Sequence, residues 1–262
     1  MHPILIDLGR FEIPTYGLLM AAAFLAALRL GIGLARRDGI DADRITGLWI
    51  VILVAAIVGA KGMLYVVEWR YYAANPRALL TSWRSAGVYY GGFVAAAFAG
   101  WVAARRAGLP IGAVSDLAAA PLALGQSIGR LGCLAAGCCY GRPTDLPWAV
   151  TFSDPRAARI TGVPLDVPLH PTQAYLSLDA LLLCGLLLLL RRVKRRRGWA
   201  DGVVFWAYVV LSGASRFALE TLRDDPRGTV GPLSTSQAFA VVAVTVGAAA
   251  LLALSRRRAR TG

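Results

Sequence analysis

The sequence is poor in charged residues. Of its 262 residues only 16% are Asp, Glu, Lys or Arg, whereas about 25% is usual in a soluble domain. The chain therefore lacks the polar surface that a protein of this size needs in water. Disorder is excluded for a related reason, because 57% of the residues are hydrophobic and disordered chains are poor in apolar residues.

Acidic residues are scarcer than basic ones, 15 against 28, which gives a formal net charge of +13. Histidine and cysteine are rarer still, with two and four copies. A basic excess indicates a nucleic acid, an anionic membrane surface or an anionic substrate as partner. The positions of the basic residues decide among these three.

Long apolar segments fill most of the chain. A helix needs about 20 mostly apolar residues to cross a bilayer. Seven segments approach or reach that length: 16–34, 46–67, 88–103, 111–128, 172–190, 202–222 and 233–254. The sequence therefore predicts an all-α polytopic membrane protein with seven transmembrane helices in a single domain, 1–262, and small outer-face arms at about 68–87 and 142–168. The first fourteen residues lack the basic-then-apolar order of a cleavable signal peptide, and we expect a short surface segment there.

The basic residues outside these segments are unevenly divided between the two sides of the membrane. Cytoplasmic loops are the ones rich in Lys and Arg. One side carries fifteen cations: Arg36, Arg37, Arg44, Arg105, Arg106, Arg191, Arg192, Lys194, Arg195, Arg196, Arg197, Arg256, Arg257, Arg258 and Arg260. The other side has longer loops and carries nine: Arg10, Arg70, Arg77, Arg84, Arg142, Arg156, Arg159, Arg223 and Arg227. This predicts an outer N-terminus and a cytoplasmic C-terminus. Most of the positive charge is thus a topology signal, and no nucleic-acid partner is expected.

Four basic residues lie inside the apolar segments: Arg29, Lys61, Arg130 and Arg216. Each intramembrane charge costs roughly 3 kcal/mol, so each needs a partner or a purpose. Arg29 can extend to the cytoplasmic surface. The other three lie toward the outer halves of their segments. With a single carboxylate, Glu220, they predict a net positive pocket suited to a phosphate headgroup. A structural ion pair between Arg216 and Glu220 and an interfacial anchor at Arg130 are the alternatives.

The most distinctive stretch follows the fourth apolar segment. Residues 129–148 read GRLGCLAAGCCYGRPTDLPW. This stretch resembles the signature of the prolipoprotein diacylglyceryl transferases, which runs roughly G-R-[IL]-G-N-F-x-N-G-E-x-[WY]-G-[RK]-P-T-D-L-P-W. Five shorter matches occur in the family's order: YGLL at 16–19, GAK at 59–61, GG at 91–92, HPTQAY at 170–175 and RFALETLR at 216–223. The resemblance covers about residues 4–254.

The resemblance implies an activity, its partners and its location. The family transfers an sn-1,2-diacylglyceryl group from phosphatidylglycerol to the lipobox cysteine of a preprolipoprotein. A thioether forms and glycerol 1-phosphate leaves. The implied partners are phosphatidylglycerol, preprolipoprotein signal peptides and membrane lipid. The implied location is the bacterial inner membrane, with the active site toward the outer leaflet. This scheme requires no metal and no cofactor.

The positive residues carry most of the expected chemistry. We expect Arg130 and Arg216 to bind the phosphate and to stabilise the leaving group in a low-dielectric pocket. Glu220 would orient Arg216, and Lys61 would add positive charge. Gly91 and Gly92 are expected to let the backbone approach the headgroup closely, because glycine has no side chain. The resemblance completes the expected substrate site with Tyr16, Gly91, Gly92, Gln173 and Arg142.

The attacking thiol must also lose a proton. The positive field of the pocket favours its thiolate. His170 and Tyr90 are the candidates for the proton transfer, and apart from His2 the imidazole of His170 is the sole one in the chain. A structural hydrogen-bonding role is the alternative for His170. A place at the membrane interface is the alternative for Tyr90 and Tyr16.

Several positions depart from the family's pattern. Tyr90 stands in place of a His, Cys133 of an Asn and Cys138 of a Glu. Leu176 and Ser212 stand where the family commonly has Glu and Tyr. Two other functions therefore stay open. One is a non-catalytic relative that binds or moves lipid, and the other is a membrane thiol–disulfide oxidoreductase built on the outer cysteines.

Three of the four cysteines are close in sequence. Cys133, Cys138 and Cys139 lie in a segment predicted to face outside, where an oxidising envelope permits disulfides. A disulfide from Cys133 to Cys138 or Cys139 is the leading interpretation. A zinc site with His170 as fourth ligand, a redox or nucleophilic thiol, and buried thiols are the alternatives. Cys184, in the middle of an apolar segment, is expected to pack in the core.

Overall fold

Two compact units make up the chain. The computed structural model describes residues 3–7, 12–82, 87–225 and 228–261. One unit comprises Met1–Gly31 and Ser115–Gly262, and the other is Ile32–Val114. Three of the predicted outer cations, Arg10, Arg84 and Arg227, lie outside the described residues, as do residues 83–86 of the predicted first arm.

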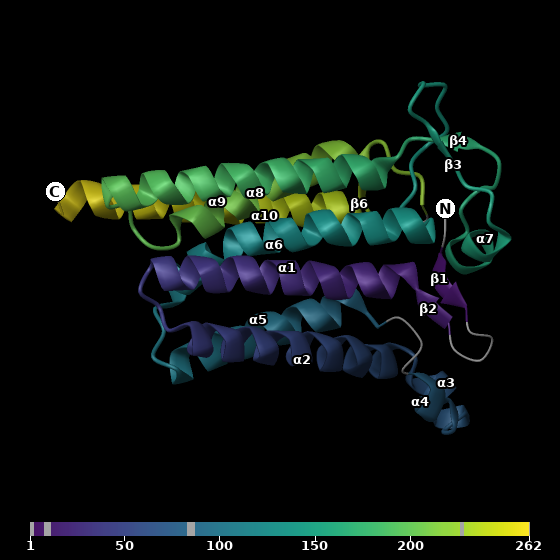
Figure 1. Ribbon diagram of the computed structural model, residues 1–262, viewed down its shortest axis with the longest axis horizontal. Coiled ribbons are helices and arrows are strands. Elements are labelled where there is room, and N and C mark those ends of the chain that lie inside the picture. The colour runs from purple at the N-terminus through teal and green to yellow at the C-terminus, as the bar shows by residue number, and fades with distance from the viewer. Residues whose placement is uncertain (1–2, 8–11, 83–86, 226–227, 262) are drawn as a thin grey trace. The chain divides into compact units, whose positions relative to one another are not determined.

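The first unit is built from five long helices. They are α1 (Thr15–Arg37), whose last residues belong to the second unit, α6 (Ile111–Ala136), α8 (Thr172–Arg197), α9 (Val203–Glu220) and α10 (Thr235–Thr261). Figure 1 shows α8, α9 and α10 running alongside one another. Their core includes Ala119, Ala123, Leu187 and Val204, each at most 1% exposed. Small side chains on α6 allow this close packing of helices.

One end of this unit is joined by a buried carboxylate. Asp116, near the start of α6, accepts hydrogen bonds from Lys194 Nζ at 2.6 Å and from the N–H groups of Gly202 at 2.9 Å and Phe205 at 2.8 Å. A buried charge is tolerated when it is paired and hydrogen-bonded, as Asp116 is. The carboxylate thereby joins the start of α6, the end of α8 and the start of α9. The other ends of these three helices carry the motif residues.

The second unit is a pair of packed helices. They are α2 (Ala42–Val67) and α5 (Tyr89–Arg106), and the short helices α3 (Trp69–Ala74) and α4 (Ala78–Thr81) follow α2. Glycines let α2 and α5 approach closely. A Cβ on Gly59 would lie 2.6 Å from the carbonyl oxygen of Gly91, and one on Gly91 would lie 2.5 Å from that of Gly59. A Cβ on Gly92 would lie 2.8 Å from the carbonyl oxygen of Ala56. Packing against α2 therefore occupies the backbone at Gly91 and Gly92, where the sequence predicts approach to a headgroup.

A substitution of Gly91 can distinguish a role in helix packing from a role in the substrate site. Gly91→Ala is expected to lower the free energy of unfolding by about 1–3 kcal/mol, because the new methyl group overpacks the helix contact. Thermal unfolding of the purified protein in detergent measures the change. Gly62→Ala, on the partner helix α2 and with no atom within 4 Å of its Cβ position, is the matched control and should unfold no earlier than the native chain. An unchanged midpoint for Gly91→Ala combined with loss of lipid transfer would instead assign the glycine to the substrate site.

Short hairpins and one helix complete the chain. β1 (Ile4–Asp7) pairs with β2 (Glu12–Pro14), and β5 (Thr229–Val230) pairs with β6 (Leu233–Ser234). Between α6 and α8, β3 (Val150–Thr151) pairs with β4 (Pro168–Leu169), and α7 (Pro155–Thr161) lies between these strands. This predicted second arm has its own core of Tyr140, Phe152, Val163 and Leu169, each at most 6% exposed.

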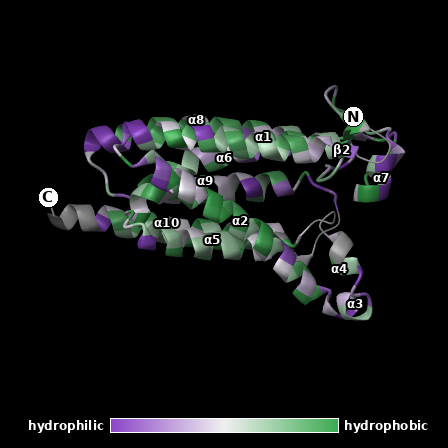
Figure 2. Ribbon diagram, turned by 60° about the horizontal axis from the view of Figure 1, so that its bottom comes forward, coloured by the Kyte–Doolittle hydropathy of each residue, from purple (hydrophilic) through white to green (hydrophobic). Residues whose placement is uncertain are grey.

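In the part of the chain that the structure describes, six helices are long and apolar enough to cross a membrane. They are α1, α2, α6, α8, α9 and α10. The third predicted segment, 88–103, is the helix α5 and does not meet that measure. Figure 2 shows hydrophobic residues along the length of α1 and α8 and hydrophilic residues at the end of α8. Large apolar side chains such as Leu182, Val58 and Val242 are 60–65% exposed, as lipid-facing side chains would be.

Helices α6 and α8 continue well past the segments predicted for them. α6 continues to Ala136, so Arg130 and Cys133 lie within the helix and not in the segment after it. α8 continues to Arg197, so its basic cluster forms the last turns of the helix. Lys and Arg are good helix formers and favourable at a helix C-terminus, which explains the second extension.

Candidate active site

The end of α6 is closed by a glycine. Gly137 has φ +77°, a left-handed conformation that glycine adopts without strain. Its N–H bonds to the carbonyl of Leu134 at 3.3 Å, and the N–H of Cys138 bonds to the carbonyl of Cys133 at 3.1 Å. This pair of bonds is the Schellman motif, in which the residues at the positions of Cys133 and Cys138 have their side chains in contact. The local sequence therefore brings two of the cysteines together.

The segment after α6 is held by two other parts of the first unit. Thr172 Oγ1 donates to the carbonyl of Cys139 at 2.7 Å, and Gln173 Nε2 donates to the carbonyl of Cys138 at 2.8 Å. Both donors are in the first turn of α8. Next, the N–H of Arg142 bonds to the carbonyl of Leu222 at 2.9 Å, just after α9.

Gly141 passes close to the start of α8. A Cβ there would lie 2.6 Å from the carbonyl oxygen of His170, so only glycine fits without a shift of the backbone. Gln173, an expected substrate ligand, is fully buried, and its side chain braces the cysteine segment. The ends of α6, α8 and α9 are thus tied together around residues 138–142.

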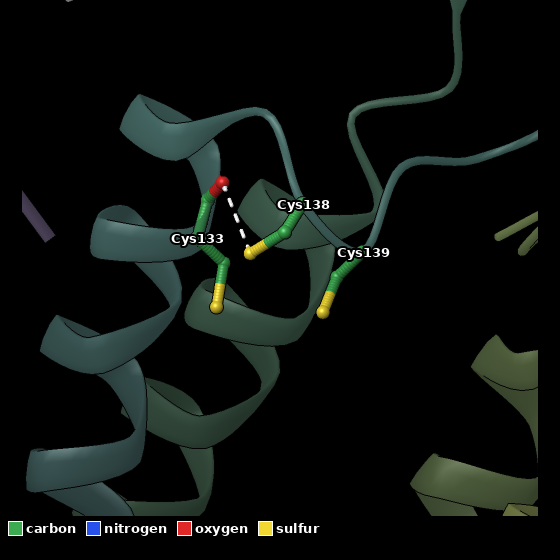
Figure 3. Close-up of side chains that lie close together, drawn as sticks. All are labelled: Cys133, Cys138 and Cys139. Carbon is green, nitrogen blue, oxygen red and sulfur yellow. Dashed lines mark hydrogen bonds between the residues drawn. The ribbon is translucent and has the colours of Figure 1, made fainter. Parts of the chain in front are cut away.

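Three sulfur atoms meet beside Arg130. The Sγ atoms of Cys133, Cys138 and Cys139 all lie within 4.8 Å of one another, and the three residues are half-buried (Figure 3). Arg130 Nη1 lies 3.8 Å from Cys139 Sγ in a weak hydrogen bond. We call Cys133, Cys138 and Cys139 the thiol cluster. The predicted disulfide is not present, since all four cysteines of the chain are thiols.

The thiol cluster concentrates negative charge on Cys139. Its hydrogen bonds with Cys133 and Cys138, together with the positive charges of Arg223 and Arg130, lower the pKa of the Cys139 thiol below its usual range. Cys139 also has φ +63°, which is uncommon for a residue other than glycine. Such backbone strain persists only where surrounding contacts hold it, here the bond from Thr172.

A second group of charges lies at the end of α9. Arg216 Nη2 pairs with Glu220 Oε2 at 2.6 Å, as the spacing of four residues predicts. Glu220 Oε1 accepts a hydrogen bond from Ser234 Oγ at 3.1 Å, and Arg216 Nη2 donates to Ser236 Oγ at 3.3 Å. These serines lie in β6 and the first turn of α10, so they bring α10 to the same site. The predicted ion pair between Arg216 and Glu220 is therefore present, and whether it serves structure or substrate binding stays a prediction.

Arg223 extends this group toward the thiol cluster. Its side chain is only 2% exposed and donates two hydrogen bonds to the Asp225 carboxylate, from Nε at 2.9 Å and from Nη2 at 3.0 Å. Arg223 Nε also lies 3.7 Å from Glu220 Oε2. Although burial alone lowers it, the pKa of Arg223 is raised by the negative charges of Cys139 and Asp225. Arg223 therefore connects the two groups of charges.

A pocket of about 460 Å³ opens beside this second group. Its charged lining comprises Arg142, Arg223, Glu220, Asp224 and Asp225. The pocket is not the net positive one that the sequence predicts, because three carboxylates face two guanidinium groups. Asp224 and Asp225 follow α9 directly and supply the extra negative charge. Of the predicted substrate residues, Arg142 and Glu220 line this pocket.

The aromatic residues expected in the site have defined neighbours. His170 Nδ1 lies 3.4 Å from the hydroxyl of Tyr175, which also accepts a 2.7 Å hydrogen bond from Trp148 Nε1. Tyr16, at the start of α1, packs on α6, since a Cβ on Gly132 would lie 3.3 Å from its ring. Tyr16 therefore lies next to the helix turns that carry Arg130 and Cys133.

Two of the expected polar residues belong to the second unit. Lys61 Nζ donates to the carbonyl of Ser82 at 2.6 Å, so its ammonium group holds the end of α4. Tyr90, in the first turn of α5, is 43% exposed. Their convergence with Arg130 and Arg216 stays a prediction.

A family model described as "Prolipoprotein diacylglyceryl transferase" matches residues 3–253. Relatives named phosphatidylglycerol–prolipoprotein diacylglyceryl transferase include the following three. The one from Clostridium tetani is 34% identical over 94% of this chain and 95% of its own. The one from Synechococcus elongatus is 34% identical over 95% and 86%, and that from Gloeobacter violaceus is 33% identical over 98% and 94%. The chain belongs to the prolipoprotein diacylglyceryl transferase family.

Two of the departures from the transferase family's pattern fall at one place in the first unit. Cys133 and Cys138, in place of Asn and Glu, are both members of the thiol cluster. Arg130, which matches the arginine of the pattern G-R-[IL]-G, therefore has a sulfur atom as neighbour in this chain.

Sequence reasoning missed three acidic residues and the importance of Arg223. Asp225 pairs with Arg223, and their separation by only two residues in the sequence could have predicted this pair. Asp116 and Asp179 lie inside α6 and α8, so Glu220 is not the single carboxylate of the apolar segments. Asp179 accepts a 2.8 Å hydrogen bond from Ser215 of α9. An ionisable residue within an apolar run was the signal for both.

Proposed function

We propose that this chain transfers the sn-1,2-diacylglyceryl group of phosphatidylglycerol to the lipobox cysteine of prolipoproteins, the first step of lipoprotein maturation. The observation that carries the proposal is the family match over residues 3–253, with relatives of this name aligned over nearly their whole length. The motif arginines at one end of the first unit support it, because an anionic headgroup needs such partners.

The transfer is a displacement at carbon. The thiol sulfur attacks the glyceryl carbon that bears the phosphate ester, a C–S bond forms and the C–O bond breaks. Glycerol 1-phosphate leaves with the electron pair, and the thiol proton passes to a base. We assign Arg130 and Arg216 to the phosphate, where fixed cations stabilise the charge that develops on the leaving group. Glu220, 2.6 Å from Arg216, is a positioning residue.

The other expected residues take the following places in the proposal. Tyr16, beside α6, and Arg142, in the pocket lining, contact the substrates. Lys61 adds positive charge from α2. His170 or Tyr90 transfers the thiol proton, and Tyr175 holds the imidazole of His170 through their 3.4 Å contact. Gly91, Gly92 and Gln173 support the site through packing and bracing.

We propose a multi-pass protein of the bacterial inner membrane with seven transmembrane helices. α5 is the seventh, an 18-residue helix packed on α2. The N-terminus is outside and the C-terminus cytoplasmic, because the basic end of α8 lies opposite the end that carries the motif residues. The active site then faces the outer leaflet, where signal peptides of prolipoproteins arrive.

Transfer by the purified protein tests the proposal. The full chain in detergent is mixed with phosphatidylglycerol and a lipobox peptide, and mass spectrometry follows the peptide. A mass gain of one diacylglyceryl group, with release of glycerol 1-phosphate, is the expected result. A peptide with Ser at the lipobox cysteine is the control. An unmodified Cys peptide in the presence of a correctly folded chain contradicts the proposal.

A lipid-binding relative without transfer is the second candidate, and one observation favours it. Arg130 Nη1 already donates a weak hydrogen bond to Cys139 Sγ at 3.8 Å, so this sulfur competes with a phosphate for the same guanidinium. Complementation separates the two functions, because a strain depleted of its own transferase regains mature lipoproteins only if this chain performs the transfer.

A further inference from the structure

The thiol cluster lies apart from the pocket, and none of the proposed steps of lipid transfer uses it. Three cysteines on one short stretch of chain, Cys133, Cys138 and Cys139, place their sulfur atoms close together (Figure 3), all within 4.8 Å of one another. Among the described residues, no other group of three or more His, Cys, Asp or Glu side chains offers ligand atoms so close together. We propose that the thiol cluster is a metal site that binds one Cu(I) ion through three thiolates.

The distances suit such an ion. With metal–sulfur bonds of about 2.3 Å, three sulfurs in a plane around one ion are about 4 Å apart. The three Sγ atoms already lie within 4.8 Å of one another, so shifts of side chains alone bring them to that spacing. Soft thiolate ligands select Cu(I) and Zn²⁺ over harder ions.

The number of ligands and the local charge favour the monovalent ion. In the described part of the chain, no His, Asp or Glu joins the group as a fourth ligand, and structural zinc sites are almost always four-coordinate. Three thiolates and Cu(I) carry a charge of −2. Arg130, 3.8 Å from Cys139 Sγ, and Arg223, which acts on Cys139 electrostatically, offset that charge. Binding releases the protons of the thiols.

The backbone around the thiol cluster is fixed before any ion binds. The Schellman motif sets Cys133 against Cys138. Cys139 is held in its left-handed conformation by the bond from Thr172, and Cys138 is held by that from Gln173. Contacts of this kind around ligands orient them and raise metal affinity. The half-buried sulfurs remain within reach of solvent.

Titration with Cu(I) tests the site. The full-length protein in detergent, reduced and kept under argon, competes with a chromophoric Cu(I) chelator. One ion per chain is expected. Cys133→Ala, Cys138→Ala and Cys139→Ala are each expected to weaken binding by at least about 100-fold, the upper end of losses seen when supporting contacts alone are removed. Cys184→Ala, a buried cysteine of α8, is the matched control and should bind like the native chain.

Several results would overturn the proposal. They are the absence of stoichiometric binding, native affinity after loss of any one cluster cysteine, uptake of Zn²⁺ but not Cu(I), and a disulfide in the cluster that mild reductants leave closed. X-ray absorption of the native complex needs no variant and should show three sulfur ligands. Fewer sulfurs, or nitrogen and oxygen ligands, would contradict it. Neither the titration nor the X-ray absorption measurement uses lipid transfer, so the outcome of each is independent of the proposed function.

Discussion

Replacing Arg216 by Ala is expected to lower the rate of lipobox peptide modification by about 10²–10³-fold, the loss found when one fixed donor to a developing negative charge is removed. Arg216 is the cation of α9 that lies inside the apolar helix and pairs with Glu220 at 2.6 Å. Without it, the departing phosphate loses a donor in a medium that stabilises charge poorly. The rate is measured by mass spectrometry with phosphatidylglycerol as donor.

Two further variants make the Arg216 result specific. Arg216→Lys keeps the charge but not the planar fork, so it should recover only part of the rate. Arg29→Ala removes the exposed arginine of α1, which we expect to extend to the membrane surface, and should transfer lipid at the native rate. A folded Arg216→Ala chain with full activity would refute the phosphate assignment. Thermal unfolding checks the fold, because the substitution removes the 2.6 Å ion pair of the buried Glu220 carboxylate.

Arg130→Ala is expected to abolish detectable transfer, with a loss of at least about 10²-fold for the same electrostatic reason. Arg130 lies on α6 two turns before the helix ends, next to the thiol cluster. Its loss would also remove a cation from beside Cys139. The same peptide assay gives the rate.

Cys139→Ala separates the two roles of Arg130. If Arg130 acts on the phosphate, then removing its sulfur neighbour should cost much less activity than removing Arg130 itself. Equal losses in Arg130→Ala and Cys139→Ala would show that the guanidinium serves only to hold the segment after α6. That result would move the phosphate site away from Arg130.

Apolar segments of the sequence predicted where the long helices lie, because a helix that crosses lipid must be apolar along most of its length. Their ends were harder to predict. The fourth apolar segment was expected to end at about Arg130, yet α6 continues to Ala136, where Gly137 closes it. The spacing of Arg216 and Glu220 predicted an ion pair, since both lie on one helical face. Patterns within a short stretch of sequence thus predicted contacts within that stretch.

Contacts between distant parts of the chain could not be read in this way. No local pattern shows that Arg142 lies beside Arg223 in one pocket, because the two are brought together only by the packing of α6, α8 and α9. Likewise, the close approach of Gly91 to Gly59 depends on how α5 packs on α2. The sequence predicted that a lipid headgroup approaches this glycine. That approach stays a prediction, whereas the helix packing is what the structure shows.

The bracing of residues 138–142 has a consequence for biosynthesis. Arg142 is held by Leu222 and Gly141 is bridged to Arg223, and both partners follow α9. A ribosome therefore releases residues 138–142 well before it has made Leu222 and Arg223, which hold Gly141 and Arg142. Pairing across such a stretch of chain is delayed, because a long loop must first close. Until α9 has entered the bilayer, the nascent chain has no assembled site with which to act on the surrounding phospholipid.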